Sequence, residues 1–159
     1  SYAKAKQVPK AAVNLSMCVR QACASFTQNS KYSAVRLETS LPTDKPCQIM
    51  ASEMEIRLAV DNLIRNAAES LLSGNCSQPL IRVQVTSTSD SIVIRVTDNG
   101  AKLTDTDIER MKTPLSSSKS DGLGLGLSIV SGVAQSNGGK LILKAREKGG
   151  LIAELSFPK

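Results

Sequence analysis

The chain has 159 residues, of which 41% are hydrophobic and 21% are charged, and it carries a formal net charge of +6. This length and composition suit one globular domain with a sizeable core. The chain has no run of about 18 apolar residues and does not open with a signal peptide, so we expect a cytoplasmic domain. Only 3% of the residues are aromatic, which leaves few platforms for stacking bases, and we expect no nucleic-acid partner. A polyanionic small ligand would suit the positive charge.

The chain contains four cysteines without a C-x-x-C pair, and it contains no histidine. We expect Cys18, Cys23, Cys47 and Cys76 to be reduced thiols of a cytosolic protein, and we expect no zinc site. Without histidine, the commonest general base is missing. Any reaction must therefore use carboxylates, amides, lysines or a metal ion.

Hydrophobic periodicity, caps and turn residues predict the elements in chain order. Residues 1–12 are rich in Lys, Ala and Gln and are typical of a frayed lead-in or domain linker, so the domain would span 13–159. The predicted elements are a helix over 13–29, strands over 35–39 and 47–50, a helix from Ser52 to Gly74, strands over 81–85 and 92–96, a helical turn over 104–111, a helix that ends at Asn137, and a hairpin over 141–145 and 151–157 that turns at Gly149 and Gly150.

The long central helix begins with Ser52-Glu53-Met54-Glu55, a capping box in which the serine and a glutamate satisfy free amides of the first turn. Between Gly100 and Gly122 little periodicity is visible, and a loop of this length in a compact domain is usually functional or mobile. Helices packed on one face of a mixed, mostly antiparallel sheet form a two-layer α/β sandwich. We expect about five strands and three main helices.

Asn62, Asn66 and Glu69 lie at positions i, i+4 and i+7 of the central helix, away from its apolar stripe. Such a polar face is usually only solvated. Asparagine has no advantage over Lys or Glu on an exposed helix, however, and two asparagines one turn apart can offer carbonyl oxygens to a hard cation. Magnesium takes few protein ligands and leaves the rest to water and phosphate. The spacing alone leaves a solvated face and a magnesium site open.

Two glycine-containing stretches are further candidates. Residues 97–100 (TDNG) end an apolar strand, where Asp98 is either part of a turn or an acceptor for an exocyclic amine at the bottom of a pocket. Residues 122–126 (GLGLG) open an apolar helix with glycine at alternate positions. Amides at such a helix start can cradle a phosphate, although tight turns and close helix packing also use glycine.

The order of these stretches resembles the nucleotide-binding domain of two-component sensor histidine kinases. These kinases belong to the ATP-binding superfamily of DNA gyrase B, the ninety-kilodalton heat-shock chaperones and MutL. Residues 61–69 (DNLIRNAAE) are similar to the family's N box, 98–100 to its first glycine box, and 122–126 to its second. Residues 114–119 (PLSSSK) stand where the family has its ATP lid. The resemblance covers roughly residues 14–158 and is nearest to the nitrogen-regulator and C4-dicarboxylate sensors.

The resemblance implies a Bergerat-type ATP-binding fold with ATP and Mg²⁺ as ligands. Asn66 would bind Mg²⁺ and Asn62 would support the same polar cluster. Asp98 would accept a hydrogen bond from the adenine amine, and Gly100 would let the chain pass the base. The γ-phosphoryl group would then be positioned for in-line transfer. The residues that would meet the phosphates are Lys119, Gly122, Gly124, Leu125 and Gly126.

The implied acceptor is a histidine on a separate dimerisation domain, so we infer that the chain is one module of a larger kinase. The parent would be a homodimer that signals to a response regulator, and it could be anchored in the inner membrane. Two departures from the family concern the lid, which would span about 101–122. Lys102 replaces the second glycine of the first glycine box, and Leu115 and Ser116 replace an aromatic pair. The nucleotide would then be held more weakly or be regulated differently.

Two other functions stay open. ATP-hydrolysing clamps of the superfamily carry a glutamate base at the position of Asn62, and an amide is not a usable base at neutral pH, which favours transfer over hydrolysis. Within phosphoryl transfer, the serine kinases of the superfamily also stay open. A degenerate, non-catalytic module that binds nucleotide or nucleic acid would explain Lys102 and the positive charge. Measured Mg-ATP affinity would separate this module from both enzymes.

Overall fold

The computed structural model describes residues 8–113 and 123–159 of the chain. One layer is a five-stranded sheet with the strand order β2-β4-β5-β7-β6. β2 pairs with β4 in parallel, and the other pairs of this sheet are antiparallel, so the predicted mixed, mostly antiparallel sheet is confirmed. Its strands are β2 (Arg36–Ser40), β4 (Leu80–Ser87), β5 (Ser91–Asp98), β6 (Lys140–Ala145) and β7 (Leu151–Pro158).

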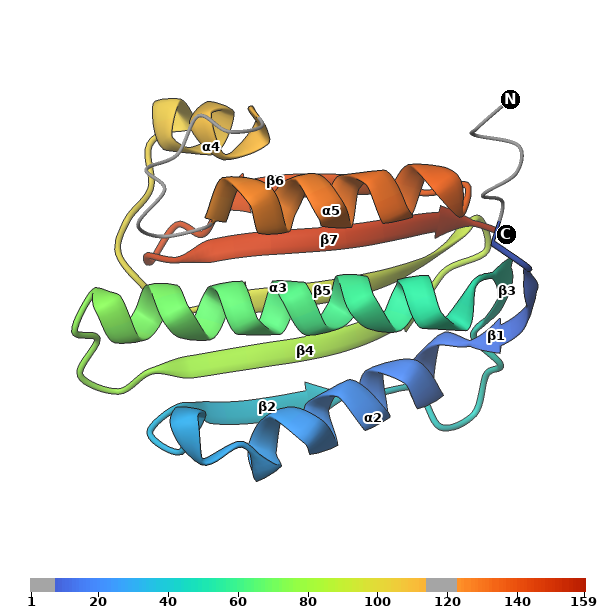
Figure 1. Ribbon diagram of the computed structural model, residues 1–159, viewed down its shortest axis with the longest axis horizontal. Coiled ribbons are helices and arrows are strands. Elements are labelled where there is room, and N and C mark those ends of the chain that lie inside the picture. The colour runs from blue at the N-terminus through green and yellow to red at the C-terminus, as the bar shows by residue number, and fades with distance from the viewer. Residues whose placement is uncertain (1–7, 114–122) are drawn as a thin grey trace.

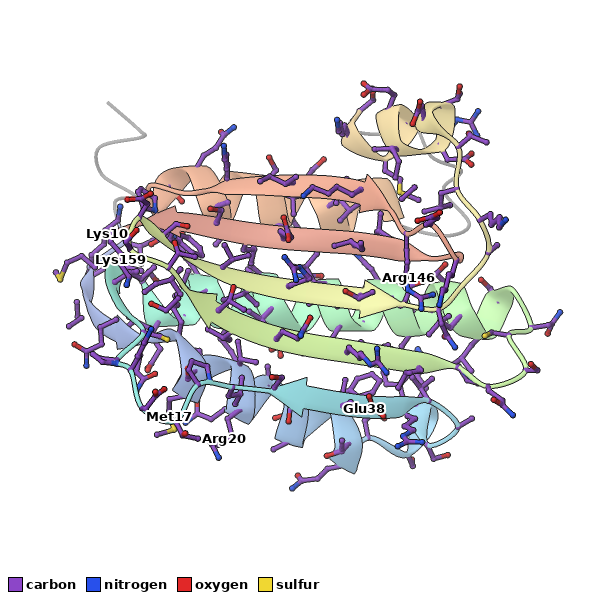
Figure 2. The ribbon with its side chains drawn as sticks, turned by 180° about the vertical axis from the view of Figure 1, so that it is seen from behind. Lys10, Met17, Arg20, Glu38, Arg146 and Lys159 are labelled. Carbon is purple, nitrogen blue, oxygen red and sulfur yellow. The ribbon has the colours of Figure 1, made fainter. Side chains whose placement is uncertain are left out.

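Three helices form the second layer and cover one face of this sheet (Figure 1). They are α2 (Leu15–Gln28), α3 (Glu53–Ser73) and α5 (Leu123–Ser136). A shorter helix, α4 (Asp105–Lys112), contacts α5 and β6. Among the described residues, the opposite face of the sheet carries no helix (Figure 2). The two-layer α/β sandwich with three main helices on one face is therefore confirmed.

The core lies between the two layers. Its residues recur at every second position of the strands and along one face of each helix. In β4 and β5 every second side chain faces the helices, which buries three apolar side chains from each strand. The apolar stripe of α3 packs against them, and each fully buried Ile, Leu or Val contributes about 1.5–3 kcal/mol to the stability of the fold. These side chains are Ile81, Val83, Val85, Ile92, Ile94 and Val96 of the sheet and Ile56, Val60, Leu63, Ile64 and Leu71 of α3.

The start of the fold differs from the sequence prediction, which placed a lead-in up to residue 12 and a helix from 13. The structure has a strand here, β1 (Ala11–Asn14), which pairs antiparallel with β3 (Gln48–Ala51) in a separate two-stranded sheet. Val13 is 3% exposed, so burial and strand pairing outweigh its helical spacing. The side chain of Asn14 accepts a hydrogen bond from Met17 N at 3.1 Å and caps α2, which begins one residue later. A short 3₁₀ helix, η1 (Ser30–Tyr32), follows α2.

The start of α3 is stabilised by Asn137, the residue that directly follows α5. Ser52 is its N-cap, as predicted, and Ser52 Oγ accepts a hydrogen bond from Glu55 N at 3.2 Å. The N–H of Ser52 donates to Asn137 Oδ1 at 2.8 Å, and Asn137 Nδ2 donates to Glu55 Oε1 at 2.9 Å. The Asn137 side chain thus stands between the two halves of the predicted capping box. A complete capping box, which the sequence analysis did not identify, starts α4 at Thr104 and Asp107.

The remaining predicted elements agree with the structure to within one or two residues at most ends, including the helical turn that becomes α4. Within the part of the chain that the structure describes, none of the helices has both the length and the apolar character needed to cross a membrane.

Candidate functional site

A pocket lies between α3, α4 and α5 and the ends of β5 and β7. Apolar side chains form most of its wall, and its few polar groups include Asn66, Ser70 and Asp98. Pockets of this composition are the usual form of small-molecule sites, because the apolar wall contributes affinity and the polar groups fix orientation. The larger apolar side chains of the wall are Leu63, Val96, Leu103, Met111, Leu127 and Leu151.

Asp98 is the last residue of β5 and is 7% exposed. It continues the inward-facing alternation of that strand, so its side chain points toward the helical layer. Its Oδ1 accepts hydrogen bonds from the N–H groups of Gly100 at 2.9 Å and Leu151 at 3.3 Å, while none of the described residues donates to Oδ2. Burial raises the pKa of this carboxyl, and the two backbone N–H groups and the charge of Arg146 partly oppose the rise. The backbone thus holds one oxygen of Asp98, and the other accepts no hydrogen bond from the described residues.

The two residues after Asp98 shape the site in different ways. A Cβ on Gly100 would lie 3.0 Å from Asp98 Oδ1, so the chain turns with little room for a side chain. Asn99 holds the loop that precedes β4, because its Oδ1 accepts the N–H of Leu80 and its Nδ2 donates to the carbonyl of Gln78, both at 2.8 Å. The sequence analysis assigned no role to Asn99. The segment is therefore a turn whose carboxylate also lines the pocket, and the acceptor role toward an exocyclic amine stays a prediction.

Asn66 projects from α3 into the wall of the same pocket. Its Nδ2 is buried and has no hydrogen-bond partner among the described residues. A buried polar group without a partner destabilises a fold by about 1–3 kcal/mol, and such groups in native structures often mark functional sites. The structure thus brings Asn66 and Asp98 to one pocket from two different elements.

The other two polar residues of the predicted helix face lie elsewhere. Asn62 is not among the pocket-lining residues that the structure identifies. Its Nδ2 donates to the carbonyl of Leu58 at 2.9 Å, and its Oδ1 accepts from Arg65 at 3.3 Å. Glu69 turns toward the α2 side and accepts a hydrogen bond from the hydroxyl of Tyr32 at 3.3 Å. Of the three residues, only Asn66 lines the pocket.

Comparison with known families gives a match over residues 51–159 to the family described as histidine kinase-, DNA gyrase B- and HSP90-like ATPase. The chain belongs to this family. The resemblance inferred from its three motifs is therefore confirmed.

Curated relatives of this ATPase-family chain include bacterial sensor kinases. Sporulation kinase B of Bacillus subtilis is 24% identical over 98% of this chain and 35% of its own length. The C4-dicarboxylate transport sensor protein DctB of Rhizobium meliloti is 30% identical over 77% of this chain and 19% of its own length. The chain thus spans between 19% and 35% of these relatives. The catalytic domain of histidine kinase ThkA matches with a TM-score of 0.80 and 20% identity, covering 96% of this chain and 97% of that one, and shows the shared fold.

Whether a magnesium ion can bind in this pocket depends on the side-chain oxygens that line it. Among the pocket-lining residues, side-chain oxygens come from Asn66, Ser70 and Asp98. The described residues contain no group of three or more His, Cys, Asp or Glu side chains arranged for a metal. One amide oxygen cannot hold Mg²⁺ alone, but it suits an ion that keeps several waters and takes its other ligands from phosphates. The donor set therefore fits magnesium only together with a phosphorylated ligand.

Part of the predicted lid and phosphate site lies outside the described residues. This part includes four residues that the sequence analysis named: Leu115, Ser116, Lys119 and Gly122. Three residues of the second glycine box fall in the first turn of α5: Gly124, Leu125 and Gly126. The first four N–H groups of a helix have no partner within it, so the backbone here has the form that anion binding needs. Lys102 is exposed on the segment that leads to α4.

The sequence analysis missed part of the wall next to Asp98. It assigned Gly149 and Gly150 only to a turn, but Gly150 lines the pocket and its N–H donates to the carbonyl of Ala101 at 2.9 Å. Two adjacent glycines before a strand predict a turn, but they do not show which distant segment the turn contacts. The contact from Leu151 to Asp98 spans 53 residues of sequence.

Proposed function

We propose that this chain is the ATP-binding catalytic domain of a sensor histidine kinase. It would donate the γ-phosphoryl group of ATP to a histidine on a separate dimerisation domain of the same parent. Membership of the ATPase family and the names of the relatives support this proposal. The observation that carries it is one apolar pocket lined by two polar side chains that are not fully paired within the described residues. There Asp98 Oδ2 accepts no hydrogen bond and the buried Asn66 Nδ2 donates none.

In this proposal Asp98 recognises the base. Its free oxygen would accept a hydrogen bond from the exocyclic amine of adenine, and the apolar side chains around it would contact the flat ring. A hydrogen bond to a charged group contributes about 1.5–3 kcal/mol, and weak competition from water in the pocket favours it. Gly100 would leave room for the base to pass.

Asn66 and the start of α5 would act on the phosphates. Asn66 would hold Mg²⁺ through its amide oxygen, and the first-turn amides around Gly124 and Gly126 would face the phosphate oxygens. When bound, Mg²⁺ supplies positive charge that stabilises the γ-phosphoryl group during transfer. Lys119 would add a further positive charge at the phosphates.

Transfer to an external acceptor fits the side chains better than hydrolysis does. Hydrolysis would need a group that accepts a proton from water. Asn62 is an amide bonded to Leu58 and Arg65, and an amide is not a usable base at neutral pH. Since the chain contains no histidine, the acceptor belongs to another domain. We further propose that the parent is a homodimer, that it signals to a response regulator, and that this domain lies in the cytoplasm.

The test supplies the parent's own dimerisation domain to this chain with γ-labelled ATP and Mg²⁺. Acid-labile label should appear on that domain, and it should disappear when the acceptor histidine is replaced by Gln or when this chain carries Asp98→Asn. Free phosphate that forms at the same rate with and without the acceptor, with no label on protein, would favour the hydrolase instead.

A further inference from the structure

The turn that joins β6 to β7 packs against the end of β5, where Asp98 lies. In this turn Gly150 N–H donates to the carbonyl of Ala101 at 2.9 Å, and the following Leu151 N–H donates to Asp98 Oδ1 at 3.3 Å. A Cβ on Gly149 would lie only 2.6 Å from the carbonyl oxygen of Gly100, so the two segments are as close as glycine permits. The orientation of the Asp98 carboxylate therefore depends on the position of this turn.

The turn needs support because its two glycines are at positive φ, +111° at Gly149 and +104° at Gly150. Glycine adopts this conformation freely but loses more entropy than any other residue when it is held there. Arg146 takes part in three hydrogen bonds of 2.9 Å, two through its backbone and one through its side chain. Its N–H donates to the carbonyl of Gly150, its carbonyl accepts from Gly149 N–H, and its Nη1 donates to the carbonyl of Gly149. The last bond has a charged donor and is therefore the strongest kind.

We infer that Arg146 is a positioning residue that holds the glycine turn, and through it the Asp98 carboxylate, in the orientation needed to receive the base. This inference rests on the proposed function, since it assumes that Asp98 Oδ2 accepts an exocyclic amine. Arg146 is not among the residues that line the pocket. It lies beside the end of β5, in a groove on the face of the sheet away from the helices (Figure 2). It therefore acts on the base through the turn and not by contact.

Arg146 differs from the other cations of that groove. Arg82, Arg95 and Lys144 each form an ion pair with a glutamate of the sheet, at 2.9, 2.6 and 3.5 Å respectively. Among the described residues, no carboxylate forms an ion pair with Arg146, whose guanidinium bonds the turn instead. Burial remains the main cause of the raised pKa of Asp98, and the Arg146 charge partly opposes it, as expected for a cation close to the carboxyl. Lysine would not reproduce the flat guanidinium donor.

The test compares the affinities for ATP and for purine riboside triphosphate, which lacks the exocyclic amine but keeps the ring, sugar and phosphates. The ratio of the two dissociation constants isolates the hydrogen bond to Asp98. Wild type should prefer ATP, and Arg146→Ala should reduce this preference by about fivefold, as expected for one misaligned hydrogen bond. Arg146→Lys keeps the charge and should give an intermediate preference. Arg82→Ala is the matched control, because it removes a cation of the same groove that does not bond the turn.

The Asp98→Asn background tests whether the effect passes through the carboxylate. There Arg146→Ala should leave the preference unchanged, and a further reduction would overturn the inference. An equal loss of affinity for both nucleotides would show that Arg146 only stabilises the fold, and would also overturn it. If wild type binds ATP without preferring it to the analogue, the adenine role of Asp98 fails and the inference fails with it. If wild type shows the preference and Arg146→Ala keeps it, only the inference fails.

Discussion

Replacing Asp98 with Asn should weaken nucleotide binding for a reason visible in its hydrogen bonds. Oδ1 already accepts the N–H groups of Gly100 and Leu151, and in the proposed function Oδ2 would accept the adenine amine. In one orientation of the new side chain, its NH₂ group faces the adenine amine, donor against donor. In the other, the NH₂ group faces the two backbone N–H groups. Either way a charged hydrogen bond is lost, which costs about 1.5–3 kcal/mol, roughly a ten- to hundredfold loss of ADP affinity.

The same substitution should leave the free domain at least as stable. Burial raises the pKa of Asp98 from its ordinary value of 3.8, so folding favours the protonated carboxyl. Between 3.8 and the higher folded pKa, the native state binds more protons than the unfolded state, and the stability contributed by this group falls as pH rises. Asn carries no such charge. Relative to wild type, Asp98→Asn should therefore gain stability across that range and keep the gain at neutral pH.

Calorimetric titration with ADP and Mg²⁺ measures the affinity, and urea unfolding from acid to neutral pH measures the stability. Asp44→Asn, at an exposed loop position, is the control for the loss of one negative charge. Equal ADP affinity of wild type and Asp98→Asn would refute the adenine role. If Asp98→Asn is less stable than wild type at neutral pH, the claim that the buried charge of Asp98 destabilises the fold is refuted.

Three further outcomes are expected. Asn66→Ala should weaken Mg-ADP binding far more than binding of metal-free ADP. If the affinity falls by the same factor with and without EDTA, Asn66 is not the metal ligand and Asn62 is the next candidate. The isolated chain should take no acid-labile label, and label on it would contradict the proposal. It should phosphorylate a supplied dimerisation domain slowly, because two separate domains lack the high effective concentration that a covalent link provides. Asn137→Leu should lower the free energy of unfolding by about 2 kcal/mol, because the Ser52 N–H loses its acceptor. Gln135→Leu, at an exposed position, is the control. If Asn137→Leu and Gln135→Leu unfold at the same urea concentration, the Asn137 hydrogen bonds do not stabilise the fold.

The parts of the fold that could be predicted are those with local signals. The N-cap at Ser52 and the apolar stripe that follows it mark α3, and alternation marks β4 and β5. β1 was not predicted, since its identity as a strand comes from pairing with β3, more than thirty residues away, and Val13 fits a helical and an extended pattern equally. The prediction of a full capping box at Ser52 was wrong for a similar reason. Asn137, which follows α5, accepts the Ser52 N–H that the Glu55 side chain would accept in a capping box.

In the candidate site, too, the residues with local sequence signals could be predicted and those defined by distant contacts could not. Asp98 stood out because a carboxylate ends an apolar strand, and Asn66 because asparagine has no advantage over Lys or Glu on an exposed helix face. The sequence could place each residue only on its own element, and the structure shows that they line one pocket. Gly150 could not be found this way, since its importance comes from contact with a segment about fifty residues earlier in the chain. Arg146 could not be found either, since it bonds the turn that makes this contact.

The Asn137 bridge has a mechanical consequence for the pocket. It pins the last turn of α5 to the first turn of α3, and both helices run from this pin toward the pocket, which Leu127 and Asn66 line. At about 1.5 Å per residue, the pin lies roughly 15 Å from Leu127 along α5 and roughly 21 Å from Asn66 along α3. The bridge therefore fixes the angle between α3 and α5 at the end of the pair that lies away from the pocket. A swing of about 5° between the two helices would change the width of the pocket by more than about 1 Å, enough to separate a well-aligned metal ligand from a poor one.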